Sequence, residues 1–130
     1  MAKQDDERRR YQRVRIDAHA RLFSDARPFR CELINISVKG ALLTRPEGWE
    51  GDDGDRCLLE IAFEGEPPVE MEVNIVRAEA EQIACDWDMF DVRGMLQLRR
   101  MLEQEVGDPE QVARELAAVY VQSDGKPPSS

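Results

Sequence analysis

Residues 29–44 of this chain read FRCELINISVKGALLT. From Phe29 to Leu33 apolar residues alternate with polar ones, which is typical of a strand that is buried on one face. A polar break follows at residues 35–40, where asparagine and serine favour a turn because their side chains bond to nearby backbone. Gly40 can adopt a positive φ or let another group approach closely. The segment therefore predicts two strands joined by a short polar loop.

The same period-two alternation recurs on both sides of this segment. It predicts further strands over residues 14–22, 57–63, 69–77 and 82–87. Glycine, proline and small polar residues predict turns or loops between them, at residues 24–28, 46–55 and 65–68. Six short strands with closely spaced turns are typical of an antiparallel sheet that closes into a small barrel.

The pattern changes after this barrel. Apolar residues from Val92 to Leu102 fall near helical spacing, and Gly107 follows as a stop. Asp108 and Pro109 suit the cap and the first turn of a second helix. The predicted fold class is mainly β, a six-stranded antiparallel barrel followed by two or three helices. We expect a flexible basic arm over residues 1–13, one folded unit over 14–121 and a disordered tail over 122–130.

Charge is distributed unevenly along the 130 residues, which carry a net charge of −9. Residues 1–30 hold nine basic and five acidic side chains, a balance of +4, so the remaining hundred residues carry −9 − 4 = −13. An acidic body repels nucleic-acid polymers, whereas a compact basic cluster can still hold a small anion. No apolar run approaches the roughly 20 residues that span a bilayer, and the polar N-terminus does not resemble a secretory signal. We expect a cytoplasmic protein that binds neither membranes nor nucleic acid.

The remaining chemistry-bearing residues predict no catalytic or metal site. Cys31, Cys57 and Cys85 lie too far apart in sequence for a disulfide framework or a zinc site, so we expect three small core residues. His19 is expected on the surface, the tryptophans in the core and residues 52–55 in a solvated loop. Because no nucleophile–base pair or cofactor motif is present, the sequence does not indicate an enzyme.

An arginine-rich segment immediately precedes the first predicted strand. It contains Arg8, Arg9, Arg10 and Arg13. Guanidinium groups are always charged and planar, so they can bind phosphate oxygens or the O6 and N7 acceptors of guanine with two hydrogen bonds. They also stack on purine rings. The segment alone could equally be a solvated terminus.

Together the two features resemble the PilZ domain, a family of bacterial cyclic di-GMP receptors. Its hallmark is R-x-x-x-R followed, after one strand, by [D/N]-x-S-x-x-G. Here these are Arg9-x-x-x-Arg13 and Asn35-x-Ser37-x-x-Gly40, and the resemblance extends over residues 7–121.

The resemblance implies a role for each motif residue. Those matching Arg9 and Arg13 hold phosphate and guanine, and Arg10 joins them. Those matching Asn35 and Ser37 bond a guanine edge and other polar atoms of the ligand, while Gly40 permits close approach. Family members with arginine at the position of Arg8 tend to bind an intercalated pair of ligand molecules.

Two positions depart from the commoner family pattern. Asn35 stands where many members have aspartate, so it offers one neutral acceptor to guanine instead of a carboxylate. Arg77 stands where similar proteins have a tryptophan that stacks on guanine. Arg77 shares the parity of Val73 and Ile75, so we expect it at the barrel mouth on the otherwise buried face. There it either contacts the ligand or is a solvated arginine at the end of a strand.

The resemblance implies a monomeric, non-enzymatic adaptor. It would bind cyclic di-GMP, as two molecules per chain, and pass the signal to a protein effector in motility or biofilm control. The alternative is a PilZ interaction module of type IV pilus assembly that does not bind the nucleotide. A third possibility, a barrel that binds nucleic acid through the basic arm, is disfavoured by the acidic body.

Overall fold

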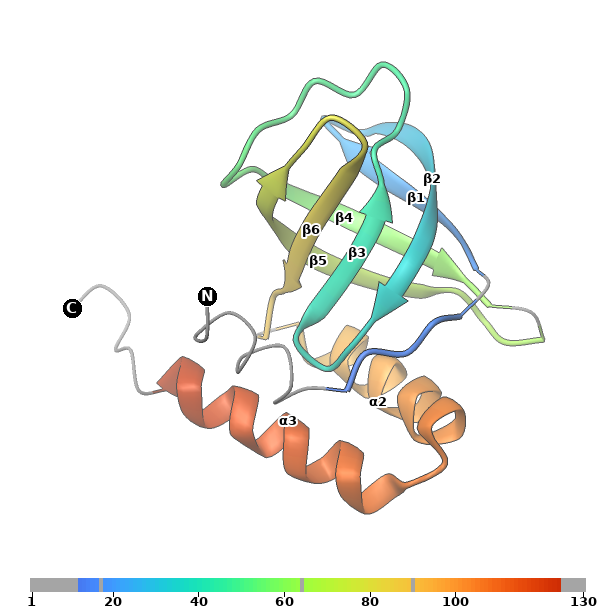
Figure 1. Cartoon of the computed structure of the whole chain (residues 1–130), viewed down its shortest axis with the longest axis vertical. Helices are drawn as coiled ribbons and strands as arrows, with labels where there is room; N and C mark the ends of the chain where they lie inside the picture. The colour runs from blue at the N-terminus through green and yellow to red at the C-terminus, as the bar shows by residue number, and fades with distance from the viewer. Residues whose placement is uncertain (1–11, 17, 64, 90, 125–130) are drawn as a thin grey trace.

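The computed structural model describes residues 12–16, 18–63, 65–89 and 91–124, the last five by their backbone alone. Six antiparallel strands close into a barrel in the order β1-β2-β3-β6-β5-β4, and two helices lie beneath it (Figure 1). The strands are β1 (His19–Ser24), β2 (Arg27–Ile36), β3 (Gly40–Thr44), β4 (Arg56–Ala62), β5 (Val69–Ala78) and β6 (Gln82–Trp87). The helices are α2 (Val92–Val106) and α3 (Pro109–Asp124). The predicted six-stranded barrel with C-terminal helices is confirmed.

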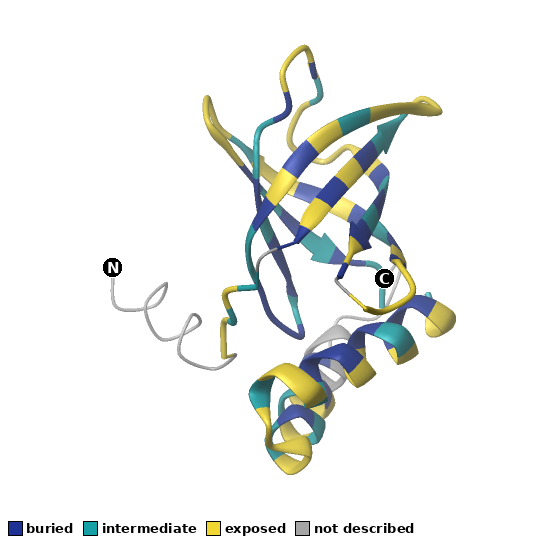
Figure 2. Cartoon of the chain, turned by 90° about the vertical axis from the view of Figure 1, so that its right-hand side faces the viewer, coloured by how far each residue is buried: buried dark blue, intermediate teal, exposed yellow. Residues whose placement is uncertain are grey.

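The barrel interior is built from the period-two pattern of the strands. Along β1, β4, β6 and most of β5, buried residues alternate with more exposed ones, as Figure 2 shows by the banding along the ribbons. Apolar side chains on the inner face are thereby removed from water, at about 25 cal/mol per Å² of buried apolar surface. Trp49, Trp87 and the three cysteines are buried in this core, which confirms their predicted place.

The predicted N-terminal strand is shorter than the alternation suggested. β1 begins at His19, whereas residues 14–22 were predicted to form one half-buried strand. Among the described residues before β1, Val14 forms an isolated bridge with Ile36, and the Ala18 carbonyl accepts from the Leu33 amide at 3.2 Å. In the β1–β2 ladder His19 pairs with Glu32, so an unbroken ladder would pair Val14 with residue 37 instead. The prediction was therefore wrong for this segment, because the register slips by one residue there.

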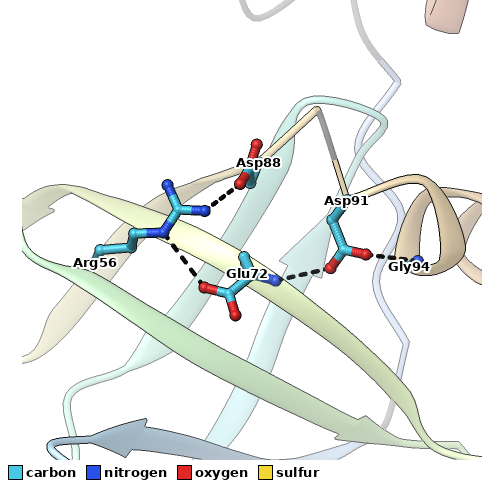
Figure 3. Close-up of polar contacts among 5 residues, drawn as sticks. All are labelled: Arg56, Glu72, Asp88, Asp91 and Gly94. Carbon is cyan, nitrogen blue, oxygen red and sulfur yellow. Dashed lines mark hydrogen bonds and ion pairs between the residues drawn. The ribbon is translucent and has the colours of Figure 1, made fainter.

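Helix α2 is joined to the barrel through one capping side chain. The Asp91 carboxylate accepts a hydrogen bond from the Gly94 amide at 3.0 Å and another from the Glu72 amide of β5 at 3.1 Å (Figure 3). A Cβ on Gly94 would lie 2.3 Å from the Met71 sulfur and 2.7 Å from the Glu70 carbonyl. Only glycine therefore lets the first turn of α2 pack directly on β5.

An ion-pair network continues from this joint across the outside of the barrel. Arg56 of β4 pairs with Glu72 of β5 at 3.3 Å and with Asp88, just after β6 (Figure 3). The hydrogen bond and charge of Asp88 raise the pKa of the Arg56 guanidinium above its ordinary value. These contacts link β4, β5 and the end of β6 at the place where α2 begins.

The boundary between the helices follows the sequence prediction. Gly107 ends α2 with a left-handed φ of 76°, and the Asp108 carboxylate caps α3 by accepting from the Gln111 amide at 3.1 Å. α3 continues to Asp124, three residues into the segment expected to be a tail, and residues 125–130 lie outside the described part. Within the described residues, neither helix is both long and apolar enough to cross a membrane.

Candidate functional site

A depression of about 480 Å³ lies on the outer face of β2, β3, β6 and β5. That volume is within the usual range for small-molecule sites, about 300–1,000 Å³. It is lined by side chains from all four strands, by the loop between β2 and β3, and by Arg13, which precedes β1. β3 and β6 form its middle and stand at the front of the barrel in Figure 1.

Four outward-facing residues form one continuous row across this face. Asn35 of β2 pairs with Leu42 of β3, Leu42 with Ala84 of β6, and Ala84 with Arg77 of β5. Neighbouring strands lie about 4.8 Å apart, so the row spans about 14 Å from end to end. It has polar groups at both ends and an apolar floor between them. We call these four residues the site row.

A β-bulge brings Asn35 into the site row. Asn35 has the sequence parity of Cys31 and Leu33, which are buried in the barrel. The register between β2 and β3 shifts between Leu33 and Asn35, so one extra residue, Ile34, reverses the parity. Bulges commonly re-aim side chains in this way. The Asn35 amide consequently faces outward.

A second bulge does the same for Arg77. The register between β5 and β6 shifts between Ile75 and Arg77, with Val76 as the extra residue. Arg77 therefore pairs with outward-facing Ala84, and Val76 and Arg77 both line the depression. The expectation that Arg77 emerges on the buried face was wrong, because alternation does not continue through the bulge.

The loop between β2 and β3 is ordered by Ser37, which is only 2% exposed. The Ser37 hydroxyl accepts hydrogen bonds from the amides of Lys39 at 3.1 Å and Gly40 at 3.4 Å. The Ser37 amide donates to the Gly40 carbonyl at 2.9 Å. Ser37 thus holds the loop in a closed turn of the kind its side chain favours.

Trp87 fixes this loop to the barrel. Its indole N–H donates to the Ser37 carbonyl at 2.9 Å, and its backbone amide donates to the Lys39 carbonyl at 3.0 Å. The ring itself is buried in the core. Trp87 was correctly predicted to lie in the core, but its pattern in the sequence did not indicate that its polar edge positions the loop.

Gly40 is required by the barrel itself. A Cβ at Gly40 would lie 1.9 Å from the carbonyl oxygen of Cys85 on β6. Of the two explanations offered from the sequence, the structure selects close approach, and the approaching group is the backbone of the neighbouring strand. Gly40 thereby allows β3 to pair with β6 immediately after the loop.

Arg13 connects the N-terminal segment to the loop. Val14 exchanges two backbone hydrogen bonds with Ile36, at 2.8 and 3.0 Å, which fixes the chain beside β2. One residue earlier, the Arg13 guanidinium donates to the Asn35 side-chain oxygen at 2.7 Å. The two halves of the sequence motif therefore meet at one place. The other arginines of the N-terminal segment, at positions 8, 9 and 10, lie outside the described residues.

Helix α3 holds the same segment from the opposite side. The Gln12 amide donates to the two Glu115 carboxylate oxygens at 3.1 and 3.2 Å. Gln111 donates to the Gln12 side-chain oxygen at 2.6 Å and to Glu115 at 3.1 Å. This contact could not be predicted from the sequence, because it joins residues about a hundred positions apart. The root of the arm, residues 12–14, is thus fixed between α3 and β2.

The charges that line the depression are mostly positive. Arg13, Lys39 and Arg77 contribute three cations, and Asp86 contributes one carboxylate. Arg77 is also paired with Glu79 at 3.1 Å, and both side chains are about half exposed. In a chain of net charge −9 this concentration of cations favours a small anion over a polymer.

Comparison with known families identifies the domain. The sequence model of the PilZ domain matches residues 7–104. The chain belongs to the PilZ domain family. That span covers the arginine segment, the barrel and most of α2.

Solved structures of PilZ proteins share the fold. The Bacillus subtilis inhibitor of motility (MotI/DgrA) is 21% identical with a TM-score of 0.54, covering 74% of this chain and 52% of that one. The PilZ domain of YcgR from Escherichia coli, solved with c-di-GMP, is 16% identical with a TM-score of 0.60, covering 85% and 98%. The PilZ domain of CeSA from a cellulose-synthesising bacterium is 12% identical with a TM-score of 0.60, covering 74% and 96%. The chain thus spans about half of the Bacillus protein and nearly all of the two isolated PilZ domains.

The structure brings together the described residues of the PilZ motif, because Arg13, Asn35, Ser37 and Gly40 all line this depression. Arg77, which departs from the family pattern, lines it as well. The depression is also lined by Lys39, Gln82 and Asp86, which were not predicted as site residues. Gln82 and Asp86 alternate with buried residues in β6, so pairing that strand with β3 would have revealed them.

The acidic loop before β4 has a structural role. Asp53 accepts from the Ala78 amide at 2.8 Å, at the end of β5, and Asp55 accepts from the Asp52 amide at 2.9 Å. Among the described residues, no three His, Cys, Asp or Glu side chains are grouped as metal ligands would be. The Asp53 carboxylate thus fastens the loop to the end of β5, while the Asp55 carboxylate stabilises a turn within the loop.

Proposed function

We infer that this chain is a cyclic di-GMP receptor that binds its ligand along the site row. The observation that carries this inference is the 2.7 Å hydrogen bond between Arg13 and Asn35, which joins both halves of the PilZ motif in one depression. The solved E. coli YcgR domain with c-di-GMP supports the same ligand class for this fold.

The depression suits the parts of a guanine dinucleotide. Leu42 and Ala84 offer an apolar floor to purine rings, and Val76, half exposed, extends it. Asn35, which Arg13 contacts, and Arg77 stand at opposite ends of the site row, about 14 Å apart, so the two ends can take different parts of an elongated ligand. Each guanidinium can bind a phosphate or a guanine Hoogsteen edge with two hydrogen bonds.

The arm completes the site in this proposal. Arg8, Arg9 and Arg10 precede the fixed root at residues 12–14, so they can close over a ligand that lies on the site row. An arginine at position 8, immediately before the motif, favours the binding of an intercalated pair of ligand molecules. We therefore expect two cyclic di-GMP molecules per chain. Ordering the arm costs conformational entropy, and several charge-assisted hydrogen bonds offset that cost.

The bound state would then act on a protein effector. Closure of the arm changes the charge of the surface around the depression, and the root of the arm contacts α3. The ligand therefore alters a surface that includes the C-terminal helices, which is where an effector could detect it.

Isothermal titration with cyclic di-GMP tests this function. Wild-type protein is expected to bind two molecules per chain. Arg13→Ala removes a charge-assisted contact worth about 1.5–3 kcal/mol, so its affinity should fall at least about tenfold while its melting temperature is unchanged. Arg15→Ala is the matched control, because Arg15 is exposed and does not line the depression.

Two results would contradict the proposal. Equal affinity of wild type and Arg13→Ala would show that Arg13 does not contribute to ligand binding. A wild-type protein that does not bind cyclic di-GMP would instead favour the PilZ interaction module that acts without the nucleotide.

A further inference from the structure

We propose that Lys39 binds a phosphate of the ligand and thereby sets the direction in which the ligand lies. A phosphodiester would occupy the loop end of the depression, which is formed by Arg13 and the loop between β2 and β3, and a base would lie toward Arg77. This inference rests on the proposed function, because it assigns one part of that ligand to a position that the PilZ motif leaves open.

The backbone of Lys39 is held on both sides. Its amide donates to the Ser37 hydroxyl at 3.1 Å, and its carbonyl accepts from the Trp87 amide at 3.0 Å. Both partners are buried, so they fix the loop to the barrel core. The partly exposed Lys39 side chain, which lines the depression, therefore starts from a fixed point. A preorganised backbone lowers the entropy that is lost when such a side chain binds.

Arg13 lies next to the same loop. The bridge between Val14 and Ile36 is antiparallel, so the preceding residue, Arg13, comes opposite Ser37, two residues before Lys39. Arg13 and Lys39 both line the depression. A phosphodiester at the loop end can therefore meet one cation from the root of the arm and another from the loop.

The cations that line the depression differ in their partners. Arg13 donates to the Asn35 side chain at 2.7 Å, and Arg77 pairs with Glu79 at 3.1 Å. No ion pair joins Lys39 to a carboxylate of the part of the chain that the structure describes. The Lys39 ammonium can therefore bind a ligand oxygen without first breaking an ion pair.

The two ends of the depression also differ in charge. At the loop end, Arg13 and Lys39 outweigh the single carboxylate of Asp86, which leaves a charge of +1. At the other end, the charge of Arg77 is offset by its ion pair with Glu79. An anionic phosphate is therefore stabilised more at the loop end, whereas a neutral base can lie at either end.

The chemistry of the side chains supports the same direction. The ammonium of lysine is a compact point charge on a flexible stem, which suits a single phosphate oxygen. The guanidinium of arginine is a rigid fork, which suits the paired O6 and N7 acceptors of guanine. Lys39 is therefore assigned to a phosphate, and Arg77 to the edge of a base.

The test compares a charged and a neutral ligand by titration calorimetry. Cyclic di-GMP is compared with its bis(methylphosphonate) analogue, in which a methyl group replaces one anionic oxygen of each linkage. Lys39→Gln removes the charge, Lys39→Met is a second neutral variant should the first fail to fold, and Lys39→Arg keeps the charge. Arg15→Gln is the control, because Arg15 is an exposed cation that does not line the depression.

Wild type, Lys39→Arg and Arg15→Gln should bind cyclic di-GMP more tightly than the neutral analogue. Lys39→Gln should lose about tenfold in affinity for cyclic di-GMP but little for the analogue, so its preference for the charged ligand should shrink by about the same factor. A neutral Lys39 variant that keeps the wild-type preference overturns the role of Lys39 and leaves the proposed function standing. Wild-type protein that does not bind cyclic di-GMP overturns the proposed function itself.

A double variant tests the direction of the ligand. Arg77→Ala combined with Glu79→Ala leaves the net charge unchanged, because it removes both members of the ion pair. It should weaken the binding of both ligands by the same factor, since the base is identical in the two. A selective loss of affinity for cyclic di-GMP would instead place a phosphate at Arg77 and overturn the assigned direction.

Discussion

Gly40 shows how one residue of the motif serves both fold and site. Its missing side chain allows the Cys85 carbonyl to lie where a Cβ would come within 1.9 Å. The approaching atom belongs to the backbone of β6, so it cannot move aside without disturbing the β3–β6 ladder. The glycine of the motif is therefore needed whether or not a ligand is bound.

Gly40→Ala should accordingly destabilise the free protein. Overpacking against fixed backbone typically costs about 1–3 kcal/mol, so the urea midpoint should fall in the absence of ligand. Lys39→Ala is the neighbouring control, which alters the loop without adding a Cβ next to β6. An unchanged midpoint for Gly40→Ala would show that the strands can separate to admit a methyl group.

Asn35 and Arg77 show the limit of sequence reasoning at this scale. Their residue types predicted polar contacts, but their parity pointed into the barrel, and only the bulges turn them outward. Each bulge coincides with two consecutive apolar residues, at 33–34 and 75–76. That doubling is weak evidence by itself, because buried strands often contain apolar pairs. The bulges could therefore not be predicted with the rest of the strands.

At the scale of elements, the strands and helices followed from local patterns. Alternation predicted most of the strands, although β1 begins later than expected, and capping residues predicted the junction of α2 and α3. The contact of α3 with the root of the arm could not be predicted, since Gln111 and Glu115 are ordinary polar residues on a helix surface. Contacts between elements distant in sequence depend on how the helices dock on the barrel.

Gln111→Ala should weaken ligand binding without destabilising the fold. The change removes the hydrogen bond to Gln12 and loosens the root, so more of the arm must be ordered when the ligand binds. One net hydrogen bond contributes about 0.5–1.5 kcal/mol, which corresponds to a twofold to tenfold loss of affinity for cyclic di-GMP.

Gln104→Ala is the control for this variant. It is the same change of glutamine to alanine, at an exposed position of α2 that forms no hydrogen bond with residues 12–14. Titration of the three proteins under the same conditions separates the contributions. Equal affinity of Gln111→Ala and wild type would show that α3 does not set the position of the arm.

At the scale of the whole molecule, the barrel core contains three thiols whose ionisation is suppressed. Burial raises the pKa of Cys85 from 9.0 to about 12, and burial together with the charge of Glu32 raises that of Cys31 to about 12. The unfolded chain loses these protons near pH 9, whereas the folded chain keeps them. Stability from the neutral thiols is thus fully present below about pH 9 and is lost as the pH rises toward 12.

The urea midpoint of the wild type should therefore decline above pH 9. A Cys31→Ala, Cys85→Ala double variant should be less stable at neutral pH, because it leaves small cavities, but its midpoint should decline less steeply between pH 9 and pH 11. Other titrating groups are common to both proteins, so the difference in slope isolates the thiols. Parallel slopes would contradict the raised pKa values.

The charge asymmetry read from the sequence also has a counterpart in the structure. The cations of the depression come from the first segment of the chain, from the loop after β2 and from β5. Composition could predict that a basic segment exists in an acidic chain, but only the pairing of β2, β3, β6 and β5 places Arg77 across the depression from Arg13.

The extra residue at position 76 makes the binding face depend on chain length as well as on residue type. Deleting Val76 would remove the bulge and leave Arg77 opposite Ala84, because Arg77 would then directly follow buried Ile75 and strict alternation would turn it outward. The deletion would take away only the half-exposed valine beside that guanidinium. A shortened strand of this kind would therefore keep every charged group of the binding face while narrowing the apolar surface on which a purine could rest.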